Sequence, residues 1–320
     1  MNFALHFMGN KLISWSIFVL LCFIWGSSFI LMKVSIEGLT GAQIASLRIF
    51  SAGIVFLPFA FFHVRNIPQK KVSLLAVTGF FGNLLPAFCF AIALLKIDSS
   101  LAGVLNSLTP LCVIFIGVLL FRDKIKSRKI VGVIIGFAGL CLLTLTQKNI
   151  SINNLGYASL VILGTISYGI NVNLVSHFLK EIKPIHIATV SLAFMSIPSG
   201  ILLWQQGFFQ VDFSDSTVQW AVFNTILLGI VASAFATVLF YILVQKASGL
   251  FASLVTYGIP FVALFWGFID GETITITGLI CLGIILLGVF LANRPEKKDS
   301  GVKTPPPELE VEKTDWIKQP

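Results

Sequence analysis

Long runs of apolar residues, separated by short charged stretches, constrain the fold of this chain more than any other feature. The segments IFVLLCFIWG at 17–26 and GLICLGIILLGVFLA at 278–292 are apolar on every face, and 56% of all residues are hydrophobic against 11% charged. A β-barrel of the outer membrane would instead show segments of alternating polarity. The sequence therefore predicts an all-α integral membrane protein whose principal partner is the lipid bilayer.

The number of spans follows from their length, because a hydrocarbon core about 30 Å thick needs roughly 20 apolar residues per helix. We predict ten transmembrane helices, near residues 12–32, 41–62, 72–94, 98–121, 129–146, 155–178, 184–205, 217–244, 249–269 and 276–293. The first is too long for a secretory signal, so we expect it to be retained. Residues 1–11 form a short N-terminus, and residues 294–320 have too little apolar surface to fold, which predicts a disordered tail.

Basic residues indicate the orientation, since they favour the cytoplasmic side of short loops. With the N-terminus inside, 18 of the 22 Lys and Arg residues fall on the cytoplasmic side, against Lys33, Lys96 and Lys148 outside. Both termini are therefore predicted to be cytoplasmic. The net charge of +8 reflects this topology and does not indicate nucleic-acid binding.

The chain also repeats internally. An offset of 150 residues pairs Phe90 with Phe240, Lys96 with Lys246 and Pro110 with Pro260, and an earlier offset of 143 pairs Gly26 with Gly169. This pattern predicts two five-helix repeats at residues 12–146 and 155–293. Because five is odd, the second repeat enters the membrane from the opposite side, as in many secondary transporters.

Two prolines interrupt predicted spans, each four residues after a polar side chain, in NSLTP at 106–110 and TYGIP at 256–260. Proline frees the carbonyl four residues earlier, here those of Asn106 and Thr256. Within a membrane, such a carbonyl is tolerated mainly against protein or a wet cavity. The alternative is a simple kink in which a neighbouring side chain binds the freed carbonyl.

Pairing across the repeats adds further polar side chains at equivalent depths. The predicted substrate-binding residues are Trp25, Ser28, Asn83, Asn106, Tyr168, Asn171, Ser233, Thr256 and Tyr257, and the predicted helix-break or gating residues are Gly26, Pro110, Gly169 and Pro260. An uncharged, partly aromatic lining of this kind suits a small, partly apolar solute. The alternative is that the Ser and Asn side chains hold helices together.

Arg48 is the one ionisable side chain well inside a predicted span. Charges in such positions are candidates for substrate binding or gating. Arg48 lies in the outer half of its span, however, so its side chain could also reach the interface and act as an anchor. No Asp or Glu lies deep in a predicted span, and Glu37, Asp98, Asp270 and Glu272 lie at the predicted outer boundary. This argues against a buried carboxylate relay and favours a facilitator, an exchanger, or coupling through those boundary carboxylates.

Signatures of other functions are missing from the sequence. The histidines His6, His63, His177 and His186 are isolated, the five cysteines are scattered singly, and the chain contains no HExxH, P-loop or GxGxxG segment. We therefore predict no enzymatic activity, no metal and no cofactor. The segment GVIIG at 132–136 indicates close helix approach, within the bundle or between protomers, so monomer and homodimer both remain open.

Several segments carry a resemblance to a known family: IWGSSFILMKV at 24–34, LRIF at 47–50, SLTPL at 107–111, FRDKI at 121–125 and YGIPFVALFWGFIDGE at 257–272. Over residues 12–293 the chain resembles EamA-type members of the drug/metabolite transporter superfamily. The family's motif residues fall on Trp25, Gly26, Arg48, Pro110, Pro260, Gly271 and Glu272. Arg122 and Asp123 stand where glycine and glutamate are usual.

The resemblance implies export of amino acids, related metabolites or toxic compounds across a bacterial inner membrane. We therefore predict a secondary transporter that exports a small metabolite by alternating access, with amino acids as the first candidates. Efflux of hydrophobic cationic toxicants is the second candidate, disfavoured because no buried carboxylate would bind them. A non-transport membrane protein or a membrane enzyme is a distant alternative.

Overall fold

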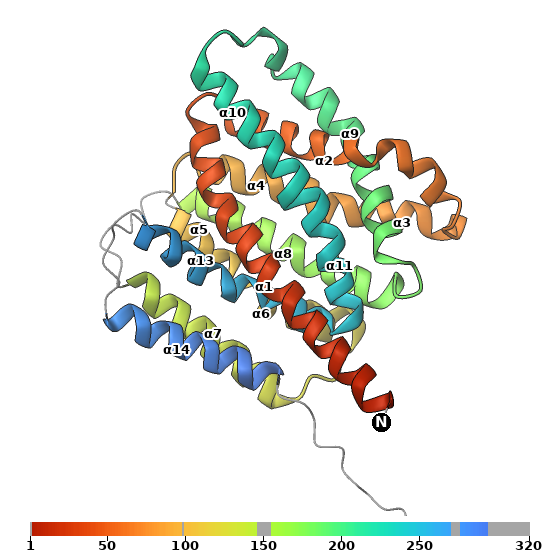
Figure 1. The fold of residues 1–320 in the computed structure, drawn as a ribbon, viewed down its shortest axis with the longest axis vertical. Coiled ribbons are helices and arrows are strands. Elements are labelled where there is room, and N and C mark those ends of the chain that lie inside the picture. Colours follow the sequence, from red (N-terminus) through yellow and green to blue (C-terminus); the bar gives the residue numbers. More distant parts are fainter. Residues whose placement is uncertain (1, 98, 146–154, 270–275, 294–320) are drawn as a thin grey trace, which may run out of the picture.

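A computed structural model describes residues 2–97, 99–145, 155–269 and 276–293, and the regular secondary structure of these residues is entirely helical (Figure 1). Six of the described helical segments are long and apolar enough to cross a membrane. The prediction of an all-α protein is thereby confirmed. The predicted tail, the boundary residues Asp98 and Asp270, and the motif residues Gly271 and Glu272 lie outside the described residues.

The first half of the chain contains α1 (Asn2–Ile36), α2 (Gly41–Val64), α3 (Gln69–Gly79), η1 (Phe80–Leu84), α4 (Leu85–Ala93), α5 (Ser99–Asn106), α6 (Thr109–Phe121) and α7 (Ser127–Leu145). The first helix begins at Asn2, so residues 2–11, which were predicted to form a separate N-terminus, are its first turns. The span predicted at 98–121 is divided into α5 and α6. The segment η1 is a π-helical turn that joins α3 to α4.

The second half contains α8 (Leu155–Phe178), α9 (Pro184–Gln205), the short 3-10 turn η2 (Phe208–Gln210), α10 (Ser216–Leu227), η3 (Leu228–Phe235), α11 (Ala236–Lys246), α12 (Gly249–Ser253), α13 (Val255–Ile269) and α14 (Ile276–Asn293). The segment η3 is also π-helical and joins α10 to α11. π-Helical turns of this kind are rare, and those that do occur are frequently found at functional sites.

Polar residues fix the starts of several helices by binding free backbone N–H groups. The Thr40 side chain accepts a hydrogen bond from the Gln43 backbone, and the Gln43 side chain accepts one from the Thr40 backbone, which forms a capping box before α2. The carboxylate of Asp215 accepts from the Thr217 N–H at the start of α10. The hydroxyl of Ser248 accepts from the Phe251 N–H at the start of α12.

Glycine allows α7 and α14 to pack directly against each other, and the two helices lie side by side along one edge of the bundle in Figure 1. A Cβ atom on Gly288 would overlap the backbone of Gly136, and one on Gly132 would overlap the backbone of Ala292. The glycines of GVIIG therefore serve helix contacts within the chain. Small residues allow this close approach in membranes, where packing replaces the hydrophobic effect as the source of helix association.

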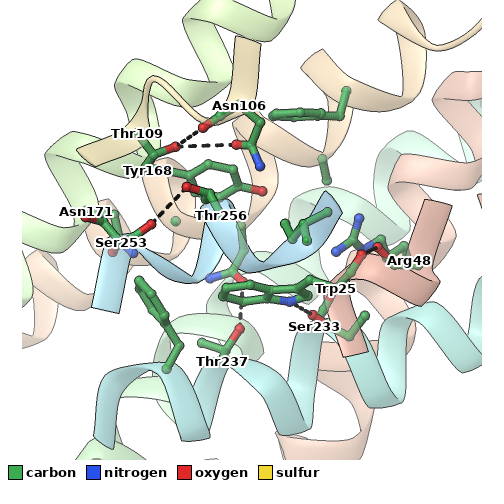
Figure 2. A pocket seen from close by; sticks show the side chains of 18 of the residues that line it. Trp25, Arg48, Asn106, Thr109, Tyr168, Asn171, Ser233, Thr237, Ser253 and Thr256 are labelled. Atoms are coloured by element: carbon green, nitrogen blue, oxygen red, sulfur yellow. Dashed lines mark hydrogen bonds between the residues drawn. The ribbon is translucent and has the colours of Figure 1, made fainter. Parts of the chain in front are cut away.

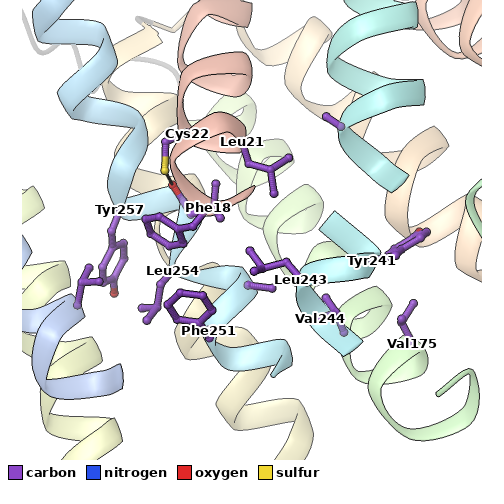
Figure 3. Packing of buried hydrophobic residues seen from close by; sticks show 14 of the residues in the cluster. Phe18, Leu21, Cys22, Val175, Tyr241, Leu243, Val244, Phe251, Leu254 and Tyr257 are labelled. Atoms are coloured by element: carbon purple, nitrogen blue, oxygen red, sulfur yellow. Dashed lines mark hydrogen bonds between the residues drawn. The ribbon is translucent and has the colours of Figure 1, made fainter. Parts of the chain in front are cut away.

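The largest cluster of buried side chains draws on helices of both halves of the chain, and Figure 3 labels members from α1, α8 and the α11–α13 region. The rings of Phe18 and Phe251 stack with their centroids 5.2 Å apart. Leu21, Leu243 and Leu254 are fully buried beside them. This packing lies at the ends of α1 and α12 that the charge pattern predicts to face the cytoplasm.

Candidate functional site

A cavity of about 110 Å³ lies between helices of both halves of the chain (Figure 2). Its lining comes from α1, α2, η1, α4, α5, α6, α8, η3, α11, α12 and α13. The structure places these sequence-predicted residues on the lining: Trp25, Ser28, Arg48, Asn83, Asn106, Tyr168, Asn171, Ser233 and Thr256. Residues from segments more than 200 positions apart are thus brought together around one space.

Tyr257, which was predicted to bind substrate, does not line the cavity. Its hydroxyl donates a hydrogen bond to the carbonyl of Val133 on α7 at 2.8 Å, and its ring lies over Gly136. Adjacent residues of a helix point about 100° apart. Thr256 therefore faces the cavity while Tyr257 faces α7.

The first helix break lies at Ser107 and Leu108, between α5 and α6. The Asn106 carbonyl, which Pro110 was predicted to free, accepts a hydrogen bond from the Thr109 hydroxyl at 2.6 Å. A neighbouring side chain thus satisfies this carbonyl. The Asn106 side chain still lines the cavity. The structure therefore contains parts of both interpretations of Pro110, a cavity beside the break and a neighbouring side chain that binds the freed carbonyl.

The second break lies at Leu254, so Pro260 falls inside α13 instead of at its start. Here the Thr256 hydroxyl donates to the carbonyl of Ser253 at 2.9 Å. At each break a threonine hydroxyl donates a hydrogen bond to the carbonyl three residues earlier. The residues of these two contacts all line the cavity: Asn106, Thr109, Ser253 and Thr256. Sequence reasoning missed Thr109 and Ser253. The short match between NSLT at 106–109 and SLVT at 253–256 is the signal that could have found them.

Gly26 and Gly169 lie where two helix pairs approach closely, away from the cavity lining. A Cβ atom on Gly26 would lie 2.6 Å from the Cβ of Val262, on α13. A Cβ atom on Gly169 would lie 2.9 Å from the Cβ of Cys112, on α6. Each predicted glycine therefore packs against a helix that carries one of the two prolines.

The π-helical segments supply polar groups to the cavity. The indole N–H of Trp25 donates to the carbonyl of Ala232 in η3 at 2.9 Å. The Thr237 hydroxyl donates to Oδ1 of Asn83 in η1 at 3.2 Å, and the Tyr241 hydroxyl donates to Oδ1 of Asn171 at 3.4 Å. Asn83 is buried, and its Nδ2 atom has no hydrogen-bond partner among the described residues.

Arg48 points inward from α2 and lines the cavity (Figure 2). Its Nε donates a hydrogen bond to the hydroxyl of Ser233 on η3 at 2.7 Å. The acidic residues in the described part of the chain are Glu37, Asp123, Glu181, Asp212 and Asp215. None of them lines the cavity or pairs with Arg48.

Aromatic rings form much of the remaining wall. The rings of Trp25 and Phe240 lie 5.3 Å apart, and those of Phe90 and Tyr168 lie 6.0 Å apart. The site therefore combines apolar walls with a few hydrogen-bonding groups and one positive charge. Cavities of this composition bind small organic solutes.

Histidines that are isolated in the sequence are paired in space, away from the cavity. Nε2 of His177 lies 2.9 Å from Oδ1 of Asp123, and the His177 ring stacks on Phe121 at 4.1 Å. The rings of His63 and His186 lie 4.8 Å apart. Within the ranges the structure describes, no three His, Cys, Asp or Glu side chains are arranged to hold a metal ion.

Comparison with known proteins identifies the chain's relatives. The model of the EamA-like transporter family matches residues 13–145 and again residues 155–294. An uncharacterized transporter of Archaeoglobus fulgidus is 26% identical over 88% of this chain and 98% of its own. The uncharacterized inner membrane transporter YedA of Escherichia coli is 27% identical over 84% and 86%. A solved crystal structure superposes with a TM-score of 0.65 over 89% of this chain and 96% of its own at 14% identity, so the fold is shared.

Proposed function

The chain belongs to the EamA-like transporter family, and on that premise we propose that it moves a small metabolite through the central cavity by alternating access. It is a multi-pass membrane transporter. The mechanism, the solute class and the direction are our proposals. The observation that carries them is a single cavity lined by polar and aromatic side chains from both halves of the chain.

Equivalent contacts in the two halves support an arrangement of ten spans as inverted five-helix repeats. Gly26 packs on Val262, and Gly169 packs on Cys112. These are the same contact made twice, because the offset of 143 relates the glycines and the offset of 150 relates their partners. The π-helical segments η1 and η3 are related in the same way. Two halves of this kind can exchange conformations, which opens one site to either side in turn.

The proposed location is a bacterial inner membrane with both termini in the cytoplasm. The asymmetry of basic residues supports this orientation. The proposed direction is export, and the proposed solute is an amino acid or a related metabolite. Efflux of cationic toxicants fits less well, because none of the acidic residues that the structure describes lines the cavity.

The function is tested by comparing metabolites in the medium of bacteria that overproduce this chain or an Asn106→Ala/Thr256→Ala variant. Both residues line the cavity, so the variant should bind the solute poorly. We expect one or a few solutes to be enriched by the wild-type chain only, at equal membrane abundance. Enrichment that persists in the variant would contradict the assignment of the cavity.

The driving force is proposed to be the solute gradient, through facilitation or exchange, because no acidic side chain of the described residues lies in the cavity. Transport by purified protein in vesicles should then continue when the proton gradient is collapsed. A strong dependence on that gradient would instead favour coupling through carboxylates at the boundary.

A further inference from the structure

We propose that Arg48 binds a carboxylate on the transported solute, and that the class of solute is an organic monocarboxylate for which an amino group is not required. The inference rests on the proposed function, since it names the solute of the same cavity. It starts from the one charged side chain on the lining.

The guanidinium of Arg48 keeps most of its hydrogen-bonding capacity free. Arginine offers five N–H donors, and the Nε–H bond to Ser233 is the one hydrogen bond that Arg48 makes to the described residues. The terminal nitrogens are left for a ligand. A planar guanidinium binds a carboxylate through two parallel hydrogen bonds, and such charge-assisted bonds are roughly twice as strong as neutral ones.

Asn83 provides a second and independent sign of a missing acceptor. The residue is 7% exposed and lines the same cavity, yet its Nδ2 has no hydrogen-bond partner among the described residues. A buried donor without a partner is unfavourable by about 1–3 kcal/mol. Both free groups are donors, so the ligand group that satisfies them must be an acceptor. An ionised carboxylate accepts and does not donate.

The acceptors of the lining show why an amino group is not required. Oδ1 of Asn83 already accepts from Thr237, Oδ1 of Asn171 accepts from Tyr241, and the Ala232 carbonyl accepts from Trp25. No acidic side chain of the described residues lines the cavity to attract an ammonium. The aromatic walls then suit the apolar body of the solute. A single positive charge matches a monocarboxylate better than a multiply charged phosphate.

The test uses the purified full chain in detergent and three compounds that share one branched apolar chain. These are leucine, 4-methylpentanoate, which lacks the amino group, and 3-methylbutylamine, which lacks the carboxylate. Binding is read as a concentration-dependent rise in unfolding temperature. We expect leucine and 4-methylpentanoate to bind and the amine not to bind. Binding of the amine as tight as that of the acid, or no binding by any compound, would overturn the proposal.

Variants assign the effect to the site. Arg48→Gln should weaken binding of 4-methylpentanoate by about 10- to 100-fold, as expected for losing charged hydrogen bonds. Arg65→Gln is the matched control, because Arg65 lies at a helix end over the Phe61 ring and not in the cavity. Wild-type affinity in Arg48→Gln would overturn the proposal.

A charge-neutralising variant keeps the test valid if Arg48→Gln fails to fold. Asn83→Asp adds a carboxylate to a lining whose one charged side chain is Arg48, so the lining becomes neutral overall and binding of 4-methylpentanoate should be lost. Retained preference for the acid in this variant would count against the proposal. The unfolding temperature without ligand reports folding for each variant.

Efflux of leucine from vesicles containing the protein separates this inference from the proposed function. Arg48-dependent binding without efflux would leave the carboxylate site standing and refute transport of this solute. Efflux that is equal in the wild type and Arg48→Gln would leave the transport function standing and overturn the carboxylate site.

Discussion

The contact between Gly26 and α13 gives a prediction whose size follows from the structure. In Gly26→Ala, the new methyl would lie 2.6 Å from Cβ and 2.9 Å from Cγ1 of Val262. Carbon atoms in favourable contact are about 3.5–4.0 Å apart. Because the Val262 Cβ is fixed to the backbone, α1 and α13 must separate by about 1 Å. We expect a loss of about 1–3 kcal/mol in unfolding free energy, the usual effect of overpacking.

The equivalent change in the other half should be milder. In Gly169→Ala, the nearest side-chain atoms are Cβ of Cys112 at 2.9 Å and Cδ1 of Ile116 at 3.0 Å. The overlap with the fixed Cβ of Cys112 is smaller than the overlap of Gly26→Ala with Val262, and the Ile116 methyl can move by a side-chain rotation, so we expect a loss of about 1 kcal/mol. Gly283→Ala is the control, because nothing lies within 4 Å of its added methyl. It should be neutral or slightly stabilising.

The assay is thermal unfolding of the purified full chain in detergent, with the monodisperse fraction measured by size exclusion. Adding Val262→Ala to Gly26→Ala should restore part of the loss, since it removes the Cγ1 contact but leaves the Cβ contact. If Gly26→Ala unfolds at the wild-type temperature, and Val262→Ala does not change that, then α1 and α13 do not pack as described.

Three further changes test other parts of the chain by the same unfolding assay. The backbone of Arg122 is left-handed, with φ 55°, so Arg122→Gly should raise the unfolding free energy by about 0.5–1 kcal/mol. Arg65→Gly, at φ −63°, should not, and equal effects of the two changes would refute backbone strain at Arg122. Thr109→Val removes the hydroxyl that binds the Asn106 carbonyl and should lose about 1–2 kcal/mol, and no loss would mean that this bond is unimportant. Trp25→Phe removes the bond to the Ala232 carbonyl and should lose about 1 kcal/mol and slow export, which wild-type rates in the metabolite assay would contradict.

Much of the cavity could be predicted from the sequence because its polar residues stand out in apolar helices and recur at matching depths. Asn106 and Thr256 were predicted from prolines, and Asn83 and Ser233 from the repeat alone, and all four line the cavity. The reason is physical: a polar side chain within a membrane is unfavourable unless it faces protein or water, so its presence already indicates its surroundings.

The direction in which side chains next to the helix breaks point could not be predicted. Tyr257 follows Thr256 in a polar segment, but only the start of α13 at Val255 decides that it turns toward α7. The second break at Leu254, ahead of Pro260, and the Thr109 hydroxyl that binds the Asn106 carbonyl are likewise outcomes of local geometry. A proline restricts the region in which a helix can be interrupted, but it does not determine the exact residue at which the interruption occurs.

Sequence by itself determined that this chain is a helical membrane protein with related halves, because hydropathy and repetition are carried by residue type and spacing. Only the tertiary structure decided which groups meet. It turned Arg48 toward Ser233, left Nδ2 of Asn83 without a partner among the described residues, and joined His177 to Asp123. Such pairings link residues from distant helices, and they depend on crossing positions and rotations that the packing of the whole bundle sets.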